Sequence, residues 1–364
     1  MARNLVFLGD ICRGRDNNLN LIRIVAAGAV LVSHAWPITG GPGTPQPLSH
    51  LLGFELGRLA VMVFFAISGF LIARSYERQP TVRQWLAARI LRLFPALTVM
   101  LLLTALVLGP LYTAMPLDAY FSDPRTQTYV PHNLTLALRQ ADLPGVFETV
   151  PYAYETNGSL WSLYFEVLCY GGVLAMGLAG AFRAWTPLVL AAAAFVGLNA
   201  AAVIAPADTL PDGFRTFLSV AMPFACGVAF HLARSWIPLS IWLLAPMLLA
   251  AFVLRATPLY HPAVVLALSY GVFLVAYLPK GRVLRYNAVG DFSYGVYIYA
   301  WPVQQAVVQG FGPMAPLENI AIAAPITLGL AILSWKLIEK PALALVRHAG
   351  PSSRPMQGDQ RLSP

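Results

Sequence analysis

The sequence predicts an all-α, polytopic membrane protein with about ten transmembrane helices. Of its 364 residues, 58% are hydrophobic and only 11% are charged, and the mean hydropathy is +0.64. A soluble domain of this length could not keep so apolar a chain in solution. Apolar runs long enough to cross about 30 Å of hydrocarbon lie at residues 17–38, 57–76, 94–113, 159–179, 185–205, 214–233, 238–254, 260–278, 289–310 and 317–337.

The segments around these runs are predicted from their composition. Residues 1–16 form a short cytoplasmic lead, residues 17–345 a single transmembrane domain, and the polar residues 346–364 a disordered cytoplasmic tail. Residues 40–47 hold too much glycine and proline for a helix and predict turns. The connection at residues 114–158 is long enough to suggest a function. Its acidic residues are Asp118, Asp123, Asp142, Glu148 and Glu155.

The distribution of basic residues predicts the orientation of the chain. With a cytoplasmic N-terminus, most of the 24 lysines and arginines fall in cytoplasmic segments, as the positive-inside rule requires. Both termini are therefore expected in the cytoplasm. The net charge of +8 then reflects anchoring beside anionic lipid, and nucleic acid is not expected as a partner. The three cysteines lack metal-ligand spacing, and no metal is expected.

Arg23 and His34 interrupt the otherwise apolar first run. Ionisable residues inside membrane helices are costly and usually functional. The two positions are eleven apart, which returns to within about 20° of the same helical face, about 16 Å further along the axis. One face therefore presents a cation and an imidazole at two depths. Arg23 is expected to face a polar cavity or an anionic partner rather than lipid.

Arg89 and Arg92 lie in a basic, amphipathic segment and project from one helical face, because they are three positions apart. Two guanidinium groups so placed suit a phosphate-bearing ligand, to which they can donate bidentate hydrogen bonds. They equally suit an interfacial helix whose arginines reach lipid head groups. The spacing leaves both interpretations open.

Ser162 and Glu166 share a face of the fourth run, four positions apart. A carboxylate inside a membrane helix needs a partner. Glu166 can pair with Arg23, orient the imidazole of His34 or hold a sugar hydroxyl. It can also belong to a purely structural ion pair between helices, and spacing does not choose among these.

Three aromatic residues, Tyr294, Tyr297 and Trp301, line one face of the ninth run. Such stripes serve packing or interface belts in many membrane helices, and in others they stack on a ligand. Pro302 removes a backbone donor within the same run and predicts a kink.

His34 has two interpretations of its own. A lone buried histidine is commonly satisfied by a neighbouring carbonyl group. An imidazole is also the natural general base for a hydroxyl at neutral pH, or a nucleophile toward a thioester. His132 and His261 lie near predicted outer loops and could contact an acceptor.

Taken together, these segments resemble the acyltransferase-3 family, whose members are membrane acyltransferases that modify bacterial surface glycans. Arg23 and His34 resemble the family's motif of a basic residue, a ten-residue spacer and a histidine. The resemblance covers residues 15–345. The other matching segments are residues 64–72, the RxxR motif Arg89-Ile90-Leu91-Arg92, residues 160–163 with Glu166, residues 293–297 with Trp301 and Pro302, and Glu339-Lys340-Pro341.

The resemblance implies a role for each matching position. His34 would be the catalytic histidine, with Arg23 as its companion and Glu166 as a third catalytic residue. Arg89 and Arg92 would bind cytoplasmic acyl-CoA as the donor substrate, with acetyl-CoA as the default. The residues implied in substrate binding are Ser68, Trp161, Ser162, Tyr294, Tyr297 and Trp301.

The predicted function is therefore that of a multi-pass O-acyltransferase in the bacterial cytoplasmic (inner) membrane. It would move an acyl group, acetyl by default, from cytoplasmic acyl-CoA to a hydroxyl of an extracytoplasmic or membrane-associated carbohydrate. A transporter of a glycan intermediate or small anion is the main alternative, with Arg23, His34 and Glu166 as its binding site or relay. A polysaccharide-assembly scaffold without chemistry is a third interpretation.

Overall fold

The computed structural model describes residues 6–348, except 13, 15, 79–80, 185–191, 194, 202–204 and 206–208. Within these residues the regular structure is helical, and extended pairing is limited to an isolated bridge between Phe7 and Pro238. The all-α class predicted from composition is therefore confirmed.

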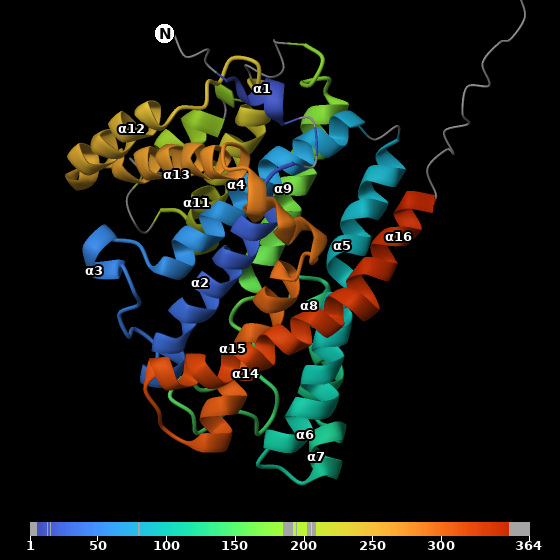
Figure 1. The fold of residues 1–364 in the computed structure, drawn as a ribbon. Coiled ribbons are helices and arrows are strands. Elements are labelled where there is room, and N and C mark those ends of the chain that lie inside the picture. Colours follow the sequence, from blue (N-terminus) through green and yellow to red (C-terminus); the bar gives the residue numbers. More distant parts are fainter. Residues whose placement is uncertain are drawn as a thin grey trace, which may run out of the picture.

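The helical elements follow one another along the chain (Figure 1). They are α1 (Leu8–Ile11), α2 (Leu19–Gly40), α3 (Ser49–Leu52), α4 (Leu56–Arg78), α5 (Val82–Leu103), η1 (Thr104–Leu108), α6 (Gly109–Tyr112), α7 (Leu117–Ser122), α8 (Pro124–Leu134), α9 (Trp161–Leu178), α11 (Asp212–Leu232), α12 (Ile241–Val253), η2 (Leu254–Ala256), α13 (Tyr260–Tyr277), η3 (Gly281–Ala288), α14 (Ser293–Phe311), α15 (Pro316–Ser334), η4 (Trp335–Glu339) and α16 (Lys340–His348).

Seven helical stretches among the described residues are long and apolar enough to cross a membrane, which confirms a multi-pass membrane protein. The predicted run at 238–254 corresponds to the shorter apolar helix Ile241–Ala256. The predicted run at 185–205 lies largely outside the described residues. The total of ten spans and the sidedness of the termini stay predictions. The seven stretches are Leu19–Gly40, Leu56–Arg78, Val82–Tyr112, Trp161–Leu178, Asp212–Leu232, Tyr260–Tyr277 and Pro316–Leu345.

Helix α14 is long enough to span a membrane but falls outside that set, because its interior carries polar side chains. Almost every residue of α14 is buried by neighbouring helices, so protein rather than lipid surrounds it. The Nε2 of Gln304 donates to the Leu31 carbonyl and to Oδ1 of Asn319, each at 3.0 Å. Internal hydrogen bonds therefore satisfy the side-chain amide donor of Gln304, one of the polar groups that the sequence places in this helix.

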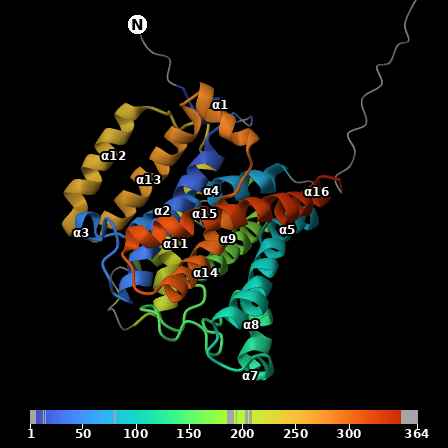
Figure 2. The same ribbon diagram turned by 60° about the horizontal axis from the view of Figure 1, so that its bottom comes forward.

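The bundle is built around α2 and α4. Helix α2 packs against α4, α14 and α15, while α4 and α11 make the most extensive pairing. Gly69 and Gly227 allow this pairing, because a Cβ atom added at either would lie 2.0 Å from a backbone oxygen of the other helix. Figures 1 and 2 place α12 beside α13 at one edge and α5 beside α16 at another.

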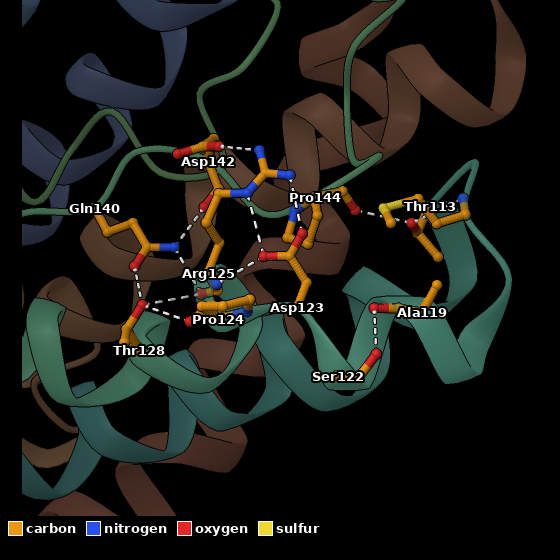
Figure 3. Close-up of polar contacts among 11 residues, drawn as sticks. Thr113, Ala119, Ser122, Asp123, Pro124, Arg125, Thr128, Gln140, Asp142 and Pro144 are labelled. Atoms are coloured by element: carbon orange, nitrogen blue, oxygen red, sulfur yellow. Dashed lines mark hydrogen bonds and ion pairs between the residues drawn. The ribbon is translucent and has the colours of Figure 1, made fainter.

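The predicted long connection at 114–158 is a folded segment rather than an open loop. It contains α7 and α8, and Asp123 caps α8 by accepting a hydrogen bond from the backbone N–H of Arg125 at 2.8 Å. Figure 3 shows the guanidinium of Arg125 between the carboxylates of Asp123 and Asp142, at 3.0 and 3.1 Å. Gln140 joins the same group by donating to the Arg125 carbonyl at 2.7 Å. These contacts tie the start of α8 to the segment around Gln140 and Asp142 that follows the helix.

The two ends of the bundle are distinct. Helix α1 and the end of α16 lie toward one end, and α6 and α7 lie at the other (Figure 1). Because Arg23 follows the start of α2 by about one turn and His34 lies in its second half, the two side chains belong to opposite halves of the molecule.

Candidate active site

An ion-paired cluster surrounds Arg23 in the first half of α2. Its Nη1 lies 2.5 Å from Oδ2 of Asp291, which precedes α14. The same carboxylate oxygen lies 2.6 Å from Nη2 of Arg92 in α5. Asp291 is 9% exposed, so both contacts form in a largely dehydrated setting where charge pairs interact strongly. One carboxylate therefore links α2 and α5 to the start of α14.

The remaining groups of this cluster are also paired. The Oδ1 of Asp291 accepts a hydrogen bond from Ser293 at 2.5 Å. Nη1 of Arg92 lies 3.1 Å from Oε2 of Glu339, whose other oxygen accepts from Ser334 at 3.0 Å. Glu339 is buried at the end of η4, a π-helical turn between α15 and α16. Such turns are frequent at functional sites.

A cavity of about 360 Å³ adjoins this cluster, and we call it the inner cavity. Its charged and polar lining comes from Arg23, Ser68, Arg89, Arg92 and Tyr170. The two arginines of the RxxR motif differ in their contacts. Arg92 is held by two carboxylates. Arg89 donates a long hydrogen bond of 3.4 Å to Ser75, and its buried Nε has no hydrogen-bond partner in the described part of the chain. Arg89 therefore retains more donor capacity toward a ligand.

Glu166 contacts neither Arg23 nor His34 in the structure. Its Oε1 accepts hydrogen bonds from the hydroxyls of Ser68 at 2.8 Å and Tyr170 at 2.6 Å. Ser68 and Tyr170 both line the inner cavity, so Glu166 supports the wall of that cavity from behind. The sequence left open a pairing of Glu166 with Arg23, but in the structure Arg23 forms its ion pair with Asp291 instead.

His34 lines a second cavity of about 520 Å³, which we call the outer cavity. The aromatic rings of Tyr152, Trp161 and Trp301 also line it. The two cavities share no lining residue. The outer cavity is further lined by Pro37, Pro42, Gly43, Thr44, Pro45, Gln46, Ser49, Glu55, Arg139, Glu155 and Gly158.

The imidazole of His34 is positioned by an aromatic neighbour rather than by a carboxylate. Its ring meets that of Trp301 edge to face, with centroids 4.8 Å apart and planes at 74°. Trp301 is fixed in turn, because its Nε1 donates to the Glu155 carbonyl at 3.1 Å. Nδ1 of His34 is buried and has no hydrogen-bond partner among the described residues. The histidine thus keeps an unused acceptor or donor site.

A hydrogen-bonded wall formed by Tyr297, Ser162 and Ser159 lies between the lining of the inner cavity and that of the outer cavity. Tyr297 donates from its hydroxyl to the Ser159 carbonyl at 2.8 Å, which uses its only proton. Ser162 must therefore donate to Tyr297 in the contact of 2.6 Å between their hydroxyl oxygens. The Tyr297 ring packs against Phe64 of the inner cavity, while Gly158, next to Ser159, lines the outer cavity.

The structure distributes the residues singled out from the sequence rather than gathering them at one point. Arg23, Ser68, Arg89 and Arg92 line the inner cavity, and His34, Trp161 and Trp301 line the outer cavity. Ser162 and Tyr297 lie in the wall between them. The remaining aromatic residue, Tyr294, donates to the Leu93 carbonyl at 2.9 Å and packs against the Arg92 guanidinium.

Sequence reasoning assigned no role to several charged residues at these sites. Glu339 stands in a matched motif and Asp291 two positions before one, and an acidic group at the end of an apolar run could have marked each as a partner for an arginine. Glu55 and Arg139 of the outer cavity carried no such signal. No group of three or more potential metal ligands occurs in the part of the chain that the structure describes.

Comparison with known proteins agrees with this architecture. The family model of the acyltransferase-3 family, described as an acyltransferase domain, matches residues 16–336. The chain is 30% identical over 344 residues to the O-acetyl transferase of Shigella phage Sf6, covering 90% of this chain and 96% of that protein. It is also 30% identical over 376 residues to nodulation protein 10 of Rhizobium leguminosarum bv. viciae, covering 91% and 94%. No solved structure gives a significant match.

A bundle of membrane-spanning helices with two separate cavities lined in part by polar side chains, matched over most of its length by an acyltransferase domain, defines an integral membrane acyltransferase. The chain belongs to the acyltransferase-3 family.

Proposed function

We propose that this protein transfers an acyl group, acetyl by default, from cytoplasmic acyl-CoA to a hydroxyl of an extracytoplasmic or membrane-associated carbohydrate. The observation that carries the proposal is the pair of cavities along α2, one lined by Arg23 and Arg89 and the other by His34. Arginines suit the phosphates of a nucleotide donor, and an imidazole suits a hydroxyl acceptor. The positive-inside distribution of basic residues supports a cytoplasmic position for the inner cavity.

The two arginines of the RxxR motif have different roles at the donor site. Arg89 contacts a phosphate group of CoA, because its guanidinium has unused donors on the cavity wall. Arg92 stays with Asp291 and Glu339 and fixes the position of α5. Arg23 shares Asp291 with Arg92, so its contribution lies on the donor side and not in direct contact with His34.

His34 acts on the acceptor hydroxyl. The hydroxyl oxygen attacks the thioester carbonyl carbon while an imidazole nitrogen of His34 takes the hydroxyl proton. The carbon–sulfur bond breaks, and the proton passes from the imidazolium to the CoA sulfur, leaving an ester and free CoA. A positioned general base of this kind contributes about 10² to 10⁴ in rate.

The acyl group has to cross the wall that contains Tyr297. The pantetheine arm rises through the inner cavity past Ser68 and Phe64, which brings the thioester toward the outer cavity. Ser162 and Tyr297 lie along that route and hold each other in place by their hydrogen bond. The aromatic rings of Trp161 and Trp301 provide apolar surfaces against which a sugar can rest on the other side.

Turnover of labelled acetyl-CoA by the purified protein in proteoliposomes tests this proposal. Wild type is compared with His34→Ala, Arg89→Ala and the control His50→Ala, which removes an exposed histidine of α3. We expect His34→Ala to lose transfer while it still binds CoA, Arg89→Ala to bind CoA more weakly, and the control to behave as wild type. Folded protein without any CoA binding would favour the transporter instead, and glycan uptake into the vesicles is the measurement for it.

A further inference from the structure

The outer cavity carries one carboxylate that makes no ion pair with the described residues. Of its charged lining residues, Arg139 and Glu155 form a two-pronged ion pair, with Nη1–Oε1 at 3.0 Å and Nη2–Oε2 at 3.2 Å. Burial raises the pKa of Glu155 above its ordinary value, and the nearby Arg139 opposes that rise. This pair is therefore internally satisfied. Glu55 is the remaining carboxylate on the cavity wall.

Glu55 stands immediately before α4, which begins at Leu56, and its side chain is half-buried. Its backbone carbonyl accepts from the Leu59 N–H at 3.1 Å, whereas its carboxylate has no hydrogen-bond or ion-pair partner among the described residues. The carboxylates of the ion-paired cluster, Asp291 and Glu339, each contact an arginine and a serine hydroxyl. A half-buried carboxylate without such partners has lost part of its hydration and gained nothing in return, unless a ligand supplies donors.

The chemistry of the lining limits what that ligand can be. An ionised carboxylate only accepts hydrogen bonds, so it matches the O–H donors of a sugar and repels a second anion. The rings of Tyr152, Trp161 and Trp301 match the apolar face of a sugar ring. His34, on the same cavity wall, is the group proposed to take a hydroxyl proton.

We propose that Glu55 binds hydroxyl groups of the acceptor, and that the outer cavity selects an uncharged sugar residue over an acidic one. This proposal rests on the proposed function and adds the class of sugar that receives the acyl group. Glu55 is then a specificity-determining residue of the acceptor site, separate from the donor site around Arg89.

The test uses purified full-length protein, labelled acetyl-CoA and de-O-acetylated envelope glycan from cells that lack this protein. Transfer rates are measured against glycan concentration and against acetyl-CoA concentration for wild type, Glu55→Gln and Glu55→Asp. The control is Glu148→Gln, which neutralises an exposed carboxylate of the 114–158 connection that does not line the cavity. Tandem mass spectrometry identifies the sugar residue that carries the new ester.

We expect the label on an uncharged sugar. Loss of a charged hydrogen-bonding partner weakens binding by about tenfold or more, so Glu55→Gln should raise KM for the glycan by that factor and leave KM for acetyl-CoA unchanged. Glu55→Asp should recover part of the loss, which also excludes misfolding as its cause, and Glu148→Gln should match wild type.

Two results would overturn the proposal: an ester on a uronic or other acidic sugar, or a glycan KM of Glu55→Gln equal to that of wild type. Failure of the underlying function has a different signature. In that case wild type neither binds acetyl-CoA nor transfers label, and the acceptor proposal fails together with it.

Discussion

Arg23 and Asp291 stand 268 positions apart in the sequence, and their side chains meet at 2.5 Å. The contact joins the first long helix of the chain to the segment that begins α14. Asp291 holds Arg92 through the same oxygen, so one carboxylate compensates two guanidinium groups at the edge of the inner cavity.

Replacing Asp291 with Asn keeps the shape of the side chain and removes its charge. Among the described residues, Arg23 is then left without an ion-pair partner and Arg92 keeps Glu339 alone. Breaking a buried pair by removing one partner costs about 3 to 5 kcal/mol, so we expect a matching loss in the free energy of unfolding in detergent. Asp118→Asn, at an exposed position, is the control. An Asp291→Asn protein as stable as wild type would show that the three charges are compensated in another way.

Arg89 and Arg92 should respond differently to replacement by Ala. Arg89→Ala should leave the melting temperature nearly unchanged and raise the Kd for CoA by about tenfold or more, because a charged hydrogen bond to phosphate is lost. Arg92→Ala should lower the free energy of unfolding by about 3 to 5 kcal/mol, because it leaves Asp291 and Glu339 with fewer partners. Calorimetric titration with CoA and thermal unfolding separate the two effects.

Arg83→Ala is the matched control for both variants. Arg83 is an exposed residue of α5 that precedes Arg89 and Arg92 in the same helix and does not line the inner cavity. Its replacement should change neither stability nor CoA affinity. Equal losses of CoA affinity in Arg89→Ala and Arg92→Ala, at unchanged stability, would contradict the division of roles.

The pairing of α4 with α11 predicts strong sensitivity at its two glycines. A Cβ at Gly69 would lie 2.0 Å from the Phe224 carbonyl oxygen, and one at Gly227 equally close to that of Ala66. Because the obstacles are backbone atoms, the helices must separate, at a cost of about 1 to 3 kcal/mol or more for each methyl group. Gly69→Ala and Gly227→Ala should therefore yield less folded protein by size-exclusion chromatography. Gly171→Ala, with nothing within 4 Å, should fold normally.

The cap of α8 predicts a local dependence on pH. Hydrogen bonds from the side chain and backbone of Arg125 lower the pKa of Asp123 below its ordinary value of 3.8. A lowered pKa stabilises the folded form above the ordinary value, and that stabilisation is lost as pH falls through the lower, folded-state pKa. The protection factor of the Arg125 amide in hydrogen exchange should drop in that acidic window. Asp123→Asn should remove the pH dependence, and an unchanged pH profile in that variant would count against the assignment.

The spans were predictable because hydropathy acts locally: a run such as 57–76 has to be buried in lipid or protein wherever it lies. Helix α14 was predictable as a helix, but its burial inside the bundle was not. Gln304 lowers the hydropathy of α14, and its polar side chain is accommodated because Asn319 and the Leu31 carbonyl accept its hydrogen bonds. Such pairings depend on the packing of distant helices, which a local pattern does not contain.

The same limit applies to the site. The sequence indicated that Arg23 needed an anionic or polar neighbour, and the structure gives it Asp291 rather than Glu166. Asp291 and Glu166 both lie in or beside apolar runs, so the local sequence could not show which of them pairs with Arg23. The helical spacing of Arg23 and His34 correctly put the two residues at different depths, and it could not reveal that each faces a separate cavity.

The wall formed by Tyr297, Ser162 and Ser159 has a consequence for the cell that carries this protein. A continuous aqueous channel through a bacterial membrane would let protons leak inward and dissipate the electrochemical gradient that drives ATP synthesis. The Ser162 and Tyr297 hydroxyls are committed to each other and to the Ser159 carbonyl, and the Phe64 ring packs against Tyr297, so these groups favour a closed route for ions. Under the proposed function, an uncharged acyl group on a slender arm is exported without uncoupling respiration from energy storage.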